Sequence, residues 1–298
     1  MSVFNPALDS PEEIKGRSLW DDAASRLMNN KAAVACMIVL SVIVLLALFG
    51  PYLSPWSYDQ VDSALEGVNQ GPTLKGFHIF GIDANGRDMF VRTLIGARVS
   101  LAVGFAATAV SMTIGVLYGA TAGFIGGWVD EVMMRFVDVL YSMPYIFFVI
   151  ILMVVFGRNF ILIFVAIGAV EWLTMARIVR GQTLSIRQKE FIEAARASGV
   201  GPFTMIRRHI IPNVLGPVIV YMTLTIPGII LAESFLSFLG LGVQEPLTSW
   251  GRLISEGAQE METSPWLLIV PACFMGVTLF CFNFIGDGLR DALDPKDR

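Results

Sequence analysis

The sequence is poor in charged residues. Asp, Glu, Lys and Arg together make up 15% of its 298 residues, whereas 55% are hydrophobic. Soluble domains carry about 25% charged residues, so a deficit of this size, spread along the chain, indicates that many residues never meet water. The formal net charge of −4 gives no reason to expect nucleic acid as a partner.

The chain also lacks the motifs of the common catalytic classes. It has no Gly-x-x-x-x-Gly-Lys-Ser/Thr phosphate loop, which excludes ATP hydrolysis by that route, and no His-Glu-x-x-His or Gly-x-Ser-x-Gly motif. Its three cysteines, Cys36, Cys273 and Cys281, lie in apolar runs without metal-ligand spacing, so we interpret them as packing residues. We therefore expect no catalytic residue, metal or cofactor in this chain.

Long apolar segments dominate the rest of the sequence. A bilayer span needs about 20 mostly apolar residues. Six segments meet this requirement; five contain no charged residue, and the fourth contains Glu171. The sequence therefore predicts an all-α polytopic membrane protein with six transmembrane helices, at 32–58, 99–129, 139–157, 159–176, 210–232 and 263–286.

Basic residues are distributed unevenly between these spans. Fifteen Lys and Arg residues lie in the N-terminal arm, the second and fourth connections and the C-terminal tail, and six lie in the other connections. Because basic residues accumulate on the cytoplasmic side, both termini are predicted to be cytoplasmic. The expected parts are a cytoplasmic arm at 1–31, a first transmembrane helix at 32–58, an extracytoplasmic segment at 59–97, a transmembrane core at 98–287 with a cytoplasmic loop at 177–213, and a cytoplasmic tail at 288–298.

Small residues recur every four positions in the second span. They predict a groove in which another helix backbone packs closely, inside the bundle or at a subunit interface, although glycine is also simply common in spans. The positions are Ala107, Ser111, Gly115, Gly119, Gly123 and Gly127.

Glu171 is the one charged residue inside a predicted span. An intramembrane charge is a candidate for a direct role in transport. The alternative is that Glu171, near the predicted cytoplasmic end of its span, reaches the membrane surface.

The stretch "EFIEAARASGVGPFTMIRRHIIPN" (190–213) is unlike the spans around it. It predicts two short helices joined by a tight corner, with Gly199 as the left-handed residue that ends the first helix. Gly201 and Pro202 suit the start of the second helix, Phe203, Ile206 and Ile210 are expected on its apolar face, and Pro212 is expected to end it. The small residues before the corner would let a partner dock closely; the alternative is an ordinary connector on the membrane surface.

Glu193, Ala194, Ala195, Gly199 and Pro212 match the pattern Glu-Ala-Ala-x-x-x-Gly-x9-Ile-x-Leu-Pro, and the stretch resembles the cytoplasmic loop of ABC importer permeases. His209 and Ile211 depart from the pattern. The stretches "FGIDANGRDMFVRTLIGARVSL", "ESFLSFLGLGVQEPLTSWG" and "FNFIGDGLRDALDPKDR" resemble the peptide and nickel permease family, and the arm "GRSLWDDAASRLMNNKAAVACMIVL" is similar to that of C-type membrane subunits of oligopeptide permeases.

The resemblance implies the type I ABC importer permease fold and a place in the bacterial inner membrane. It implies four kinds of partner beside membrane lipid: a second homologous permease subunit, two cytoplasmic ATPase subunits that bind ATP and Mg, an extracytoplasmic binding protein, and the peptide substrate. Glu193 would contact an ATPase, and the helix after Gly199 would be the coupling helix. A self-sufficient carrier or channel and an intramembrane enzyme are the alternative functions.

A second set of candidate residues lies in the predicted outer segments. Asp83, Gly86, Arg87 and Asp88 match a pattern of the same family. With the segment 240–251, which contains Trp250, they are expected to form a docking surface for the binding protein or an outer gate. The alternative is that Arg87 and Asp88 only fix the shape of a loop.

Overall fold

The computed structural model describes residues 19–62, 70–156 and 160–293. Within these ranges the chain is helical, with isolated bridges in place of strands, which confirms the predicted all-α class. Residues 1–18 of the predicted arm, 294–298 of the predicted tail and the boundary at 157–159 between two predicted spans lie outside the described residues. The helices are α1 (Leu19–Asn29), α2 (Lys31–Phe49), α3 (Met89–Ile125), α4 (Gly127–Tyr141), α5 (Tyr145–Phe156), α6 (Phe160–Arg187), α7 (Glu190–Ala197), α8 (Pro202–Met205), α9 (Ile211–Phe238), α10 (Trp250–Gln259) and α11 (Trp266–Leu293), with single turns η1 (Gly50–Tyr52), η2 (Lys75–Phe77) and η3 (Ile206–Ile210).

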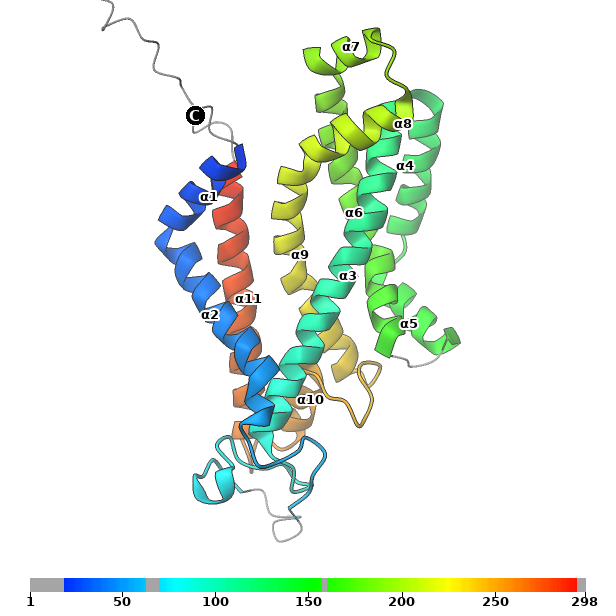
Figure 1. Ribbon diagram of the computed structural model, residues 1–298. Helices are drawn as coiled ribbons and strands as arrows, with labels where there is room; N and C mark the ends of the chain where they lie inside the picture. The colour runs from blue at the N-terminus through cyan, green and yellow to red at the C-terminus, as the bar shows by residue number, and fades with distance from the viewer. Residues whose placement is uncertain (1–18, 63–69, 157–159, 294–298) are drawn as a thin grey trace, which may run out of the picture.

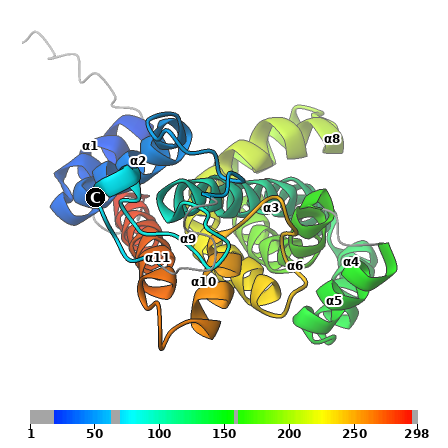
Figure 2. The ribbon, with the colours of Figure 1, turned by 90° about the horizontal axis from the view of Figure 1, so that it is seen from below.

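The helices form two groups that meet at one end (Figure 1). α3, α6 and α9 pack together with α4 and α5 outside α6, while α1, α2 and α11 form the second group. Figure 2 shows α4 and α5 on the side opposite to α1 and α2. α7 and α8 lie at the same end as α1, and α10 lies at the other end. This agrees with a shared side for the termini and the loop 177–213, although the assignment of that side as cytoplasmic stays a prediction.

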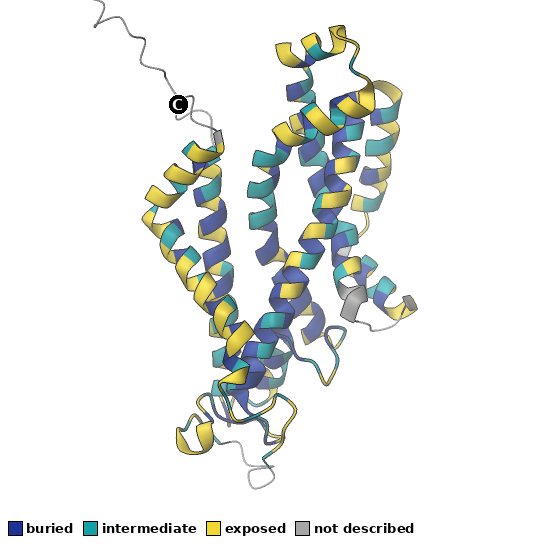
Figure 3. Ribbon diagram, viewed as in Figure 1, coloured by how far each residue is buried: buried dark blue, intermediate teal, exposed yellow. Residues whose placement is uncertain are grey.

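Clusters of buried apolar side chains hold the helices together. In one group Val103 of α3 packs with Met153 of α5, Ile167 of α6 and Ile229 of α9. A further cluster around the buried Trp250 joins α2 and α11 to α3 and α9. Figure 3 shows buried residues along α3, α6 and α9, whereas α2 is exposed along its outer face. An apolar helix with an exposed apolar face is typical of contact with lipid.

The glycine groove of α3 is filled by α6. A Cβ added to Gly119 would meet the carbonyl oxygen of Ala176, and one added to Gly123 would lie 2.9 Å from that of Arg180. Gly115 faces the same helix. Because a side chain at these positions would collide with backbone, the small residues allow two long helices to approach more closely than side chains permit.

Gly127 does not belong to this groove, and its assignment to helix packing is wrong. α3 ends at Ile125, and Gly126 and Gly127 have φ of +71° and +57°, so the chain turns away before α4. Nothing lies within 4 Å of a Cβ added at Gly127. The four-residue spacing continues in the sequence to Gly127, although the helix on which this spacing places residues on one face has already ended.

The helix boundaries differ from the predicted spans. Four helices in the described ranges are long and apolar enough to cross a membrane, and a bent pair makes up to five, so the count of six stays a prediction. The predicted span at 139–157 is wrong as a single helix, because α4 and α5 meet at 82° around Pro144. Proline lacks the N–H that continues a helix and disfavours helical geometry in the residue before it.

Candidate functional site

The corner between α7 and α8 is built by local backbone chemistry. Gly199 has φ of +79°, which confirms the predicted left-handed geometry, and the N–H of Val200 donates to the carbonyl of Ala195 at 3.2 Å. Gly201 precedes α8 in extended geometry, and Pro202 occupies its first turn, as predicted. At the base of the loop Ile192 is fully buried. The corner is therefore fixed by hydrogen bonds and by a buried anchor.

The outer edge of this corner has little side-chain bulk. Glu193, Ala194 and Pro202 are exposed, and Ala195 is half-buried. Nothing lies within 4 Å of a Cβ added at Gly199. The edge thus protrudes from the molecule and is open to a partner, and the backbone behind it is held in place.

The apolar face of the second helix is confirmed at Ile206 and Ile210, which pack in the buried cluster, and is wrong at Phe203. Phe203 is 76% exposed, and Met205, at 1% exposed, is buried in its place. Because the helix starts at Pro202, its register turns Met205 toward the buried Ile192 and Phe203 outward. Phe203 is therefore an exposed aromatic residue at the tip of the loop.

Pro212 does not end the second helix, and this prediction is wrong. η3 is a π-helical turn in which the N–H of Ile211 donates to the carbonyl of Ile206, and Pro212 lies in the first turn of α9. Proline is tolerated in a first helical turn because its missing N–H is not needed there. The chain therefore runs as one helical rod of 37 residues from Pro202 to Phe238.

The outer segment before α3 is organised by two aspartates. Asp83 accepts hydrogen bonds from the N–H groups of Asn85 and Arg87, both at 2.9 Å. Gly86 between them has φ of +75°, a geometry that glycine adopts without strain. This turn explains the family spacing, because the carboxylate and the glycine are both needed to form it.

Asp88 caps α3 from a buried position. Its side chain accepts from the N–H of Val91 at 2.9 Å and lies 2.9 Å from Nδ1 of His78, which is also buried. Burial raises the pKa of Asp88, and the hydrogen bonds from Val91 and His78 oppose this rise. Asp88 therefore fixes the start of α3 and does not face a partner.

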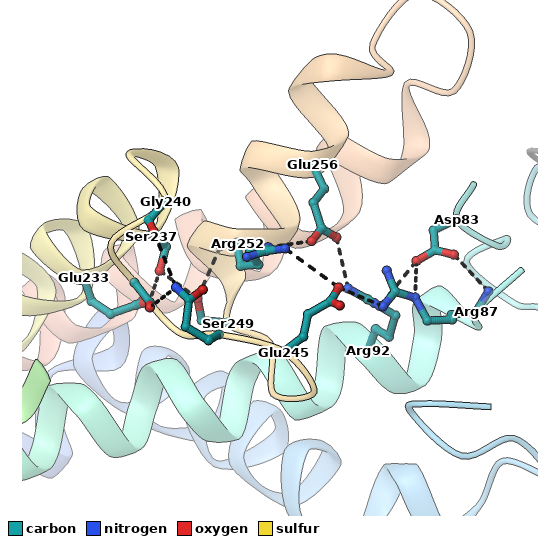
Figure 4. A network of polar contacts seen from close by, with 12 residues as sticks. Asp83, Arg87, Arg92, Glu233, Ser237, Gly240, Glu245, Ser249, Arg252 and Glu256 are labelled. Carbon is teal, nitrogen blue, oxygen red and sulfur yellow. Dashed lines mark hydrogen bonds and ion pairs between the residues drawn. The ribbon is translucent and has the colours of Figure 1, made fainter. Parts of the chain in front are cut away.

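Six charged residues form a closed ring of alternating sign around this turn (Figure 4). The three arginines and three carboxylates come from the turn before α3, from the first turn of α3, from α10 and from the loop between α9 and α10. The nitrogen–oxygen distances, in order around the ring, are Asp83–Arg87 2.8 Å, Arg87–Glu245 3.2 Å, Glu245–Arg252 3.8 Å, Arg252–Glu256 2.6 Å, Glu256–Arg92 3.0 Å and Arg92–Asp83 3.3 Å.

The ring has a buried side and an exposed side. The side chain of Arg92 is 4% exposed, whereas that of Glu245 is 55% exposed. Hydrogen bonding to Arg87 lowers the pKa of Glu245. Burial disfavours charge on Arg87, but the charge of Asp83 and hydrogen bonds from Asp83 and Glu245 outweigh it and raise the pKa of Arg87. Glu245 is thus the exposed member that fastens the loop 239–249.

A second polar network lies deeper, beneath the same loop. Glu233 of α9 is fully buried and accepts hydrogen bonds from Ser237 Oγ at 2.6 Å and from Ser100 Oγ of α3 at 3.3 Å. Ser100 Oγ also accepts from the N–H of Trp250, whose indole Nε1 donates to the carbonyl of Thr93. Glu233 was not predicted from the sequence, where its only signal is a serine four residues later, on the same helix face.

The burial of Trp250 changes its interpretation. It is 0% exposed, so it offers no surface for direct docking and instead joins the first turn of α10 to α3. Of the outer residues singled out from the sequence, Arg87 is the one whose side chain reaches the surface beside Glu245.

The family model for "binding-protein-dependent transport system inner membrane component" matches residues 115–298, and that for the "N-terminal TM domain of oligopeptide transport permease C" matches residues 18–72. The chain belongs to this permease family. The first model includes the whole α7–α8 corner.

Curated relatives cover almost the entire permease. It is 58% identical over 286 residues to the oligopeptide transport system permease protein OppC of Haemophilus influenzae, covering 96% of this chain and 91% of that protein. For OppC of Escherichia coli K12 the identity is 59%, covering 96% and 94%, and for OppC of Bacillus subtilis 168 it is 44%, covering 100% and 98%. These likenesses and the apolar helices place the permease in the inner membrane.

A solved structure of the methionine ABC transporter MetNI in an inward-facing conformation has the same fold. The match has a TM-score of 0.55 at 19% identity and covers 69% of the permease and 98% of that chain. This confirms the predicted ABC permease fold.

Glu171 lies far from the end of its helix, unlike in the prediction. α6 continues to Arg187, sixteen residues beyond Glu171, or about 24 Å at 1.5 Å per residue. Glu171 is half-buried and forms no ion pair among the described residues.

Proposed function

We propose that this permease is one of two membrane subunits that form the solute pathway of an ATP-driven importer, and that the solutes are oligopeptides. The relatives named oligopeptide transport system permease over 96% of the chain support this proposal. Because the chain has no phosphate loop, ATP and Mg would be bound by two partner ATPase subunits. An extracytoplasmic binding protein would deliver the peptide.

The α7–α8 corner is the part through which the ATPases act. The observation that carries this assignment is the continuity of α8, η3 and α9, because a displacement of the corner moves a rod that reaches the other end of the bundle. Glu193 and the exposed edge around Gly199 provide the contact. Closure of the ATPases on ATP would then bias the bundle between two arrangements. The predicted domain limits stay a proposal, and α6 continues to Arg187, ten residues past the start of the predicted loop at 177–213.

Purification of the tagged permease from its native membrane in mild detergent tests the proposal. We expect ATPase subunits to co-purify with the wild type and to be lost from a Glu193→Lys, Gly199→Asp double variant. Glu262→Lys makes the same charge change at an exposed position beyond α10, and should retain the ATPases. If the wild type carries no ATPase and moves solute alone in vesicles, the alternative of a self-sufficient carrier replaces this proposal.

The outer ring is proposed to respond to the binding protein. Arg87 and Glu245 lie together at the surface and connect the loop 239–249 to the segment before α3. A binding protein that docks here, or that competes for one of these charges, would release or fasten this loop. The ring thus serves as a docking surface or as an outer gate.

Charge reversal distinguishes the two roles. Arg87→Glu should abolish the stimulation of ATPase activity by the binding protein while the complex still assembles, and Lys75→Glu, at an exposed position elsewhere on the outer segment, should not. Combining Arg87→Glu with Glu245→Arg restores an opposite-charge pair. Recovery of stimulation identifies a gate, continued loss identifies direct docking, and unchanged stimulation in Arg87→Glu refutes both.

A further inference from the structure

A groove of about 650 Å³ opens between α4 and α6, on the side away from α2. Its lining carries both signs of charge together with an exposed tryptophan. The residues that matter here are Trp128, Glu131, Arg135, Asp138, Arg177 and Arg180.

Ion pairs join the two helices across this groove. Arg177 donates to Asp138 at 2.8 Å, and its guanidinium lies 4.2 Å from the ring centre of Tyr141. Arg180 makes two hydrogen bonds to Asp130, at 2.5 and 2.6 Å. The side chains of Asp138 and Arg177 are 52% and 39% exposed. These charges are therefore paired but not sealed inside the protein.

The charges lie beside the uncharged part of α3. Gly115 and Gly119 of α3 contact α6 on both sides of Ala176, and α3 has no charged residue from 99 to 125. Asp138 is eleven residues from the start of α4 at Gly127, or about 16 Å along the helix axis, and Tyr118 of α3 donates to the carbonyl of Met133 of α4 at 2.8 Å. Charged side chains at the level of an apolar span are unfavourable in contact with lipid and usually face protein or water.

The backbone at the end of the groove also indicates contact with water or protein. α4 ends at Tyr141, and the exposed residues Ser142, Met143 and Pro144 form a break before α5. Non-helical backbone at membrane depth occurs where it is buried in protein or lines a water-filled cavity. Broken helices often border the binding site in transporters.

Polar groups continue inward from the groove. Tyr141 contacts Arg177 at its lower end, and Glu171 lies six residues before Arg177 on α6, about 9 Å along the helix axis. Glu171 is the one acidic residue that the sequence places inside an apolar span. α2, by contrast, exposes Val42 and Leu45 and has no charged residue after Lys31.

We propose that the groove between α4 and α6 is this subunit's wall of the solute pathway, a water-lined surface over which a zwitterionic peptide moves toward Glu171. The proposal rests on the proposed function for the nature of the solute. The positive and negative side chains on one wall suit a ligand that carries an ammonium and a carboxylate group. The aromatic side chain at the rim suits its apolar side chains.

Thiol labelling of the permease in its native membrane tests whether the wall is in contact with water. The parent carries Cys273→Ala, since Cys273 is the exposed native cysteine and Cys36 and Cys281 are buried. Val132→Cys and Asp138→Cys place thiols in the groove, and Val42→Cys is the control. Val132 and Val42 are equally exposed, at 46% and 48%, and Val42 lies eleven residues into α2, as Asp138 does in α4.

A membrane-impermeant quaternary ammonium methanethiosulfonate should label both groove thiols at least tenfold faster than the Val42 thiol, because thiolate forms in water and not in lipid. Trialanine should slow labelling in the groove only. The proposal would be overturned if the groove thiols were labelled as slowly as the control, or if the peptide gave no protection. A disulfide from Val132→Cys to the second permease would also overturn it. The labelling rates need no ATPase, so loss of ATPase co-purification would defeat the proposed function alone.

Charge selectivity gives a second readout that a structural role would not change. Arg135 is exposed and makes no ion pair among the described residues, so Arg135→Glu should leave assembly intact. We expect uptake of Ala-Glu-Ala relative to Ala-Lys-Ala to fall roughly two- to fivefold, the range for partly exposed charge pairs. Lys75→Glu makes the same change outside the groove and should leave the ratio unaltered. An unchanged ratio in Arg135→Glu would show that solute does not pass this wall.

Discussion

Replacement of Gly119 by alanine is the sharpest test of the packing between α3 and α6. The added Cβ would collide with the carbonyl oxygen of Ala176, and it would lie 2.9 Å from Cβ of Val179 and 3.0 Å from the backbone nitrogen of Arg180. Two of these three atoms belong to the backbone, so no side-chain rotation relieves the contact. The two helices must separate locally.

The expected cost follows from this geometry. Overpacking of a well-packed interface costs about 1–3 kcal/mol, while alanine in a helix interior gains about 0.5–1 kcal/mol over glycine. Gly181 of the same helix pair provides the control, because nothing lies within 4 Å of a Cβ added there. Gly181→Ala keeps the gain and has no collision. The two variants should therefore differ by about 1–3 kcal/mol, Gly119→Ala being the less stable.

Thermal unfolding of the two purified variants in the same detergent, followed by tryptophan fluorescence, measures the difference. Gly123→Ala, with its Cβ 2.9 Å from the carbonyl of Arg180, should fall on the destabilised side as well. If Gly119→Ala is as stable as Gly181→Ala, α3 and α6 do not approach closely in the folded permease, and the glycines of α3 do not form a packing groove for α6.

Three further predictions concern the two ends of the molecule. Gly199→Ala should weaken the corner by about 1–2 kcal/mol, since φ is +79°, and should speed hydrogen exchange in 190–205; Gly201→Ala, with equally open space but negative φ, should not, and equal effects would contradict the backbone argument. Asp88→Ala should lower thermal stability by about 0.5–2 kcal/mol through loss of the α3 cap, with Asp88→Asn closer to the wild type because its amide oxygen still accepts. The lowered pKa of Glu245 means that its pair with Arg87 stabilises the loop above the unfolded pKa of about 4.3 and that this stabilisation is lost as pH falls through the lower folded value. Hydrogen exchange of 240–249 should rise as pH falls through the folded-state pKa of Glu245, and Glu245→Gln should remove that pH dependence.

Proline shows how far local sequence reasoning reaches in the fold. The same residue type breaks the chain at Pro144 and leaves it continuous at Pro212. The sequence identifies both as potential breaks, but the outcome depends on the turn before each proline. A π-helical turn precedes Pro212 and supplies the hydrogen bond from Ile211 to Ile206, whereas α4 has already ended before Pro144. Composition predicts apolar helices; their joints depend on packing that no local pattern records.

The candidate sites also differ in whether they depend on local sequence or on contacts between distant residues. The turns at Gly86 and Gly199 are formed by residues within five positions of each other, and the sequence predicts the left-handed residue at Gly199. The charged ring is different, because Arg87 and Glu245 are 158 residues apart, and Arg92 and Glu256 are 164 apart. A single sequence gives no information on which distant charges will meet. The buried Glu233 was missed for the same reason.

The arrangement of α9 connects the two ends of the permease. The rod begins at Pro202 in the exposed corner, and its last turns carry Glu233 in the outer network. A rod of 37 residues spans about 55 Å, so a displacement at the corner reaches the outer network unless the rod bends on the way. It can bend at Pro217 and at Pro227, the two prolines inside α9, which lack a backbone N–H; Pro227 is followed by Gly228, with open space around it. Coupling between the ends therefore depends on how stiff the helix is at these two prolines, and not on either site alone.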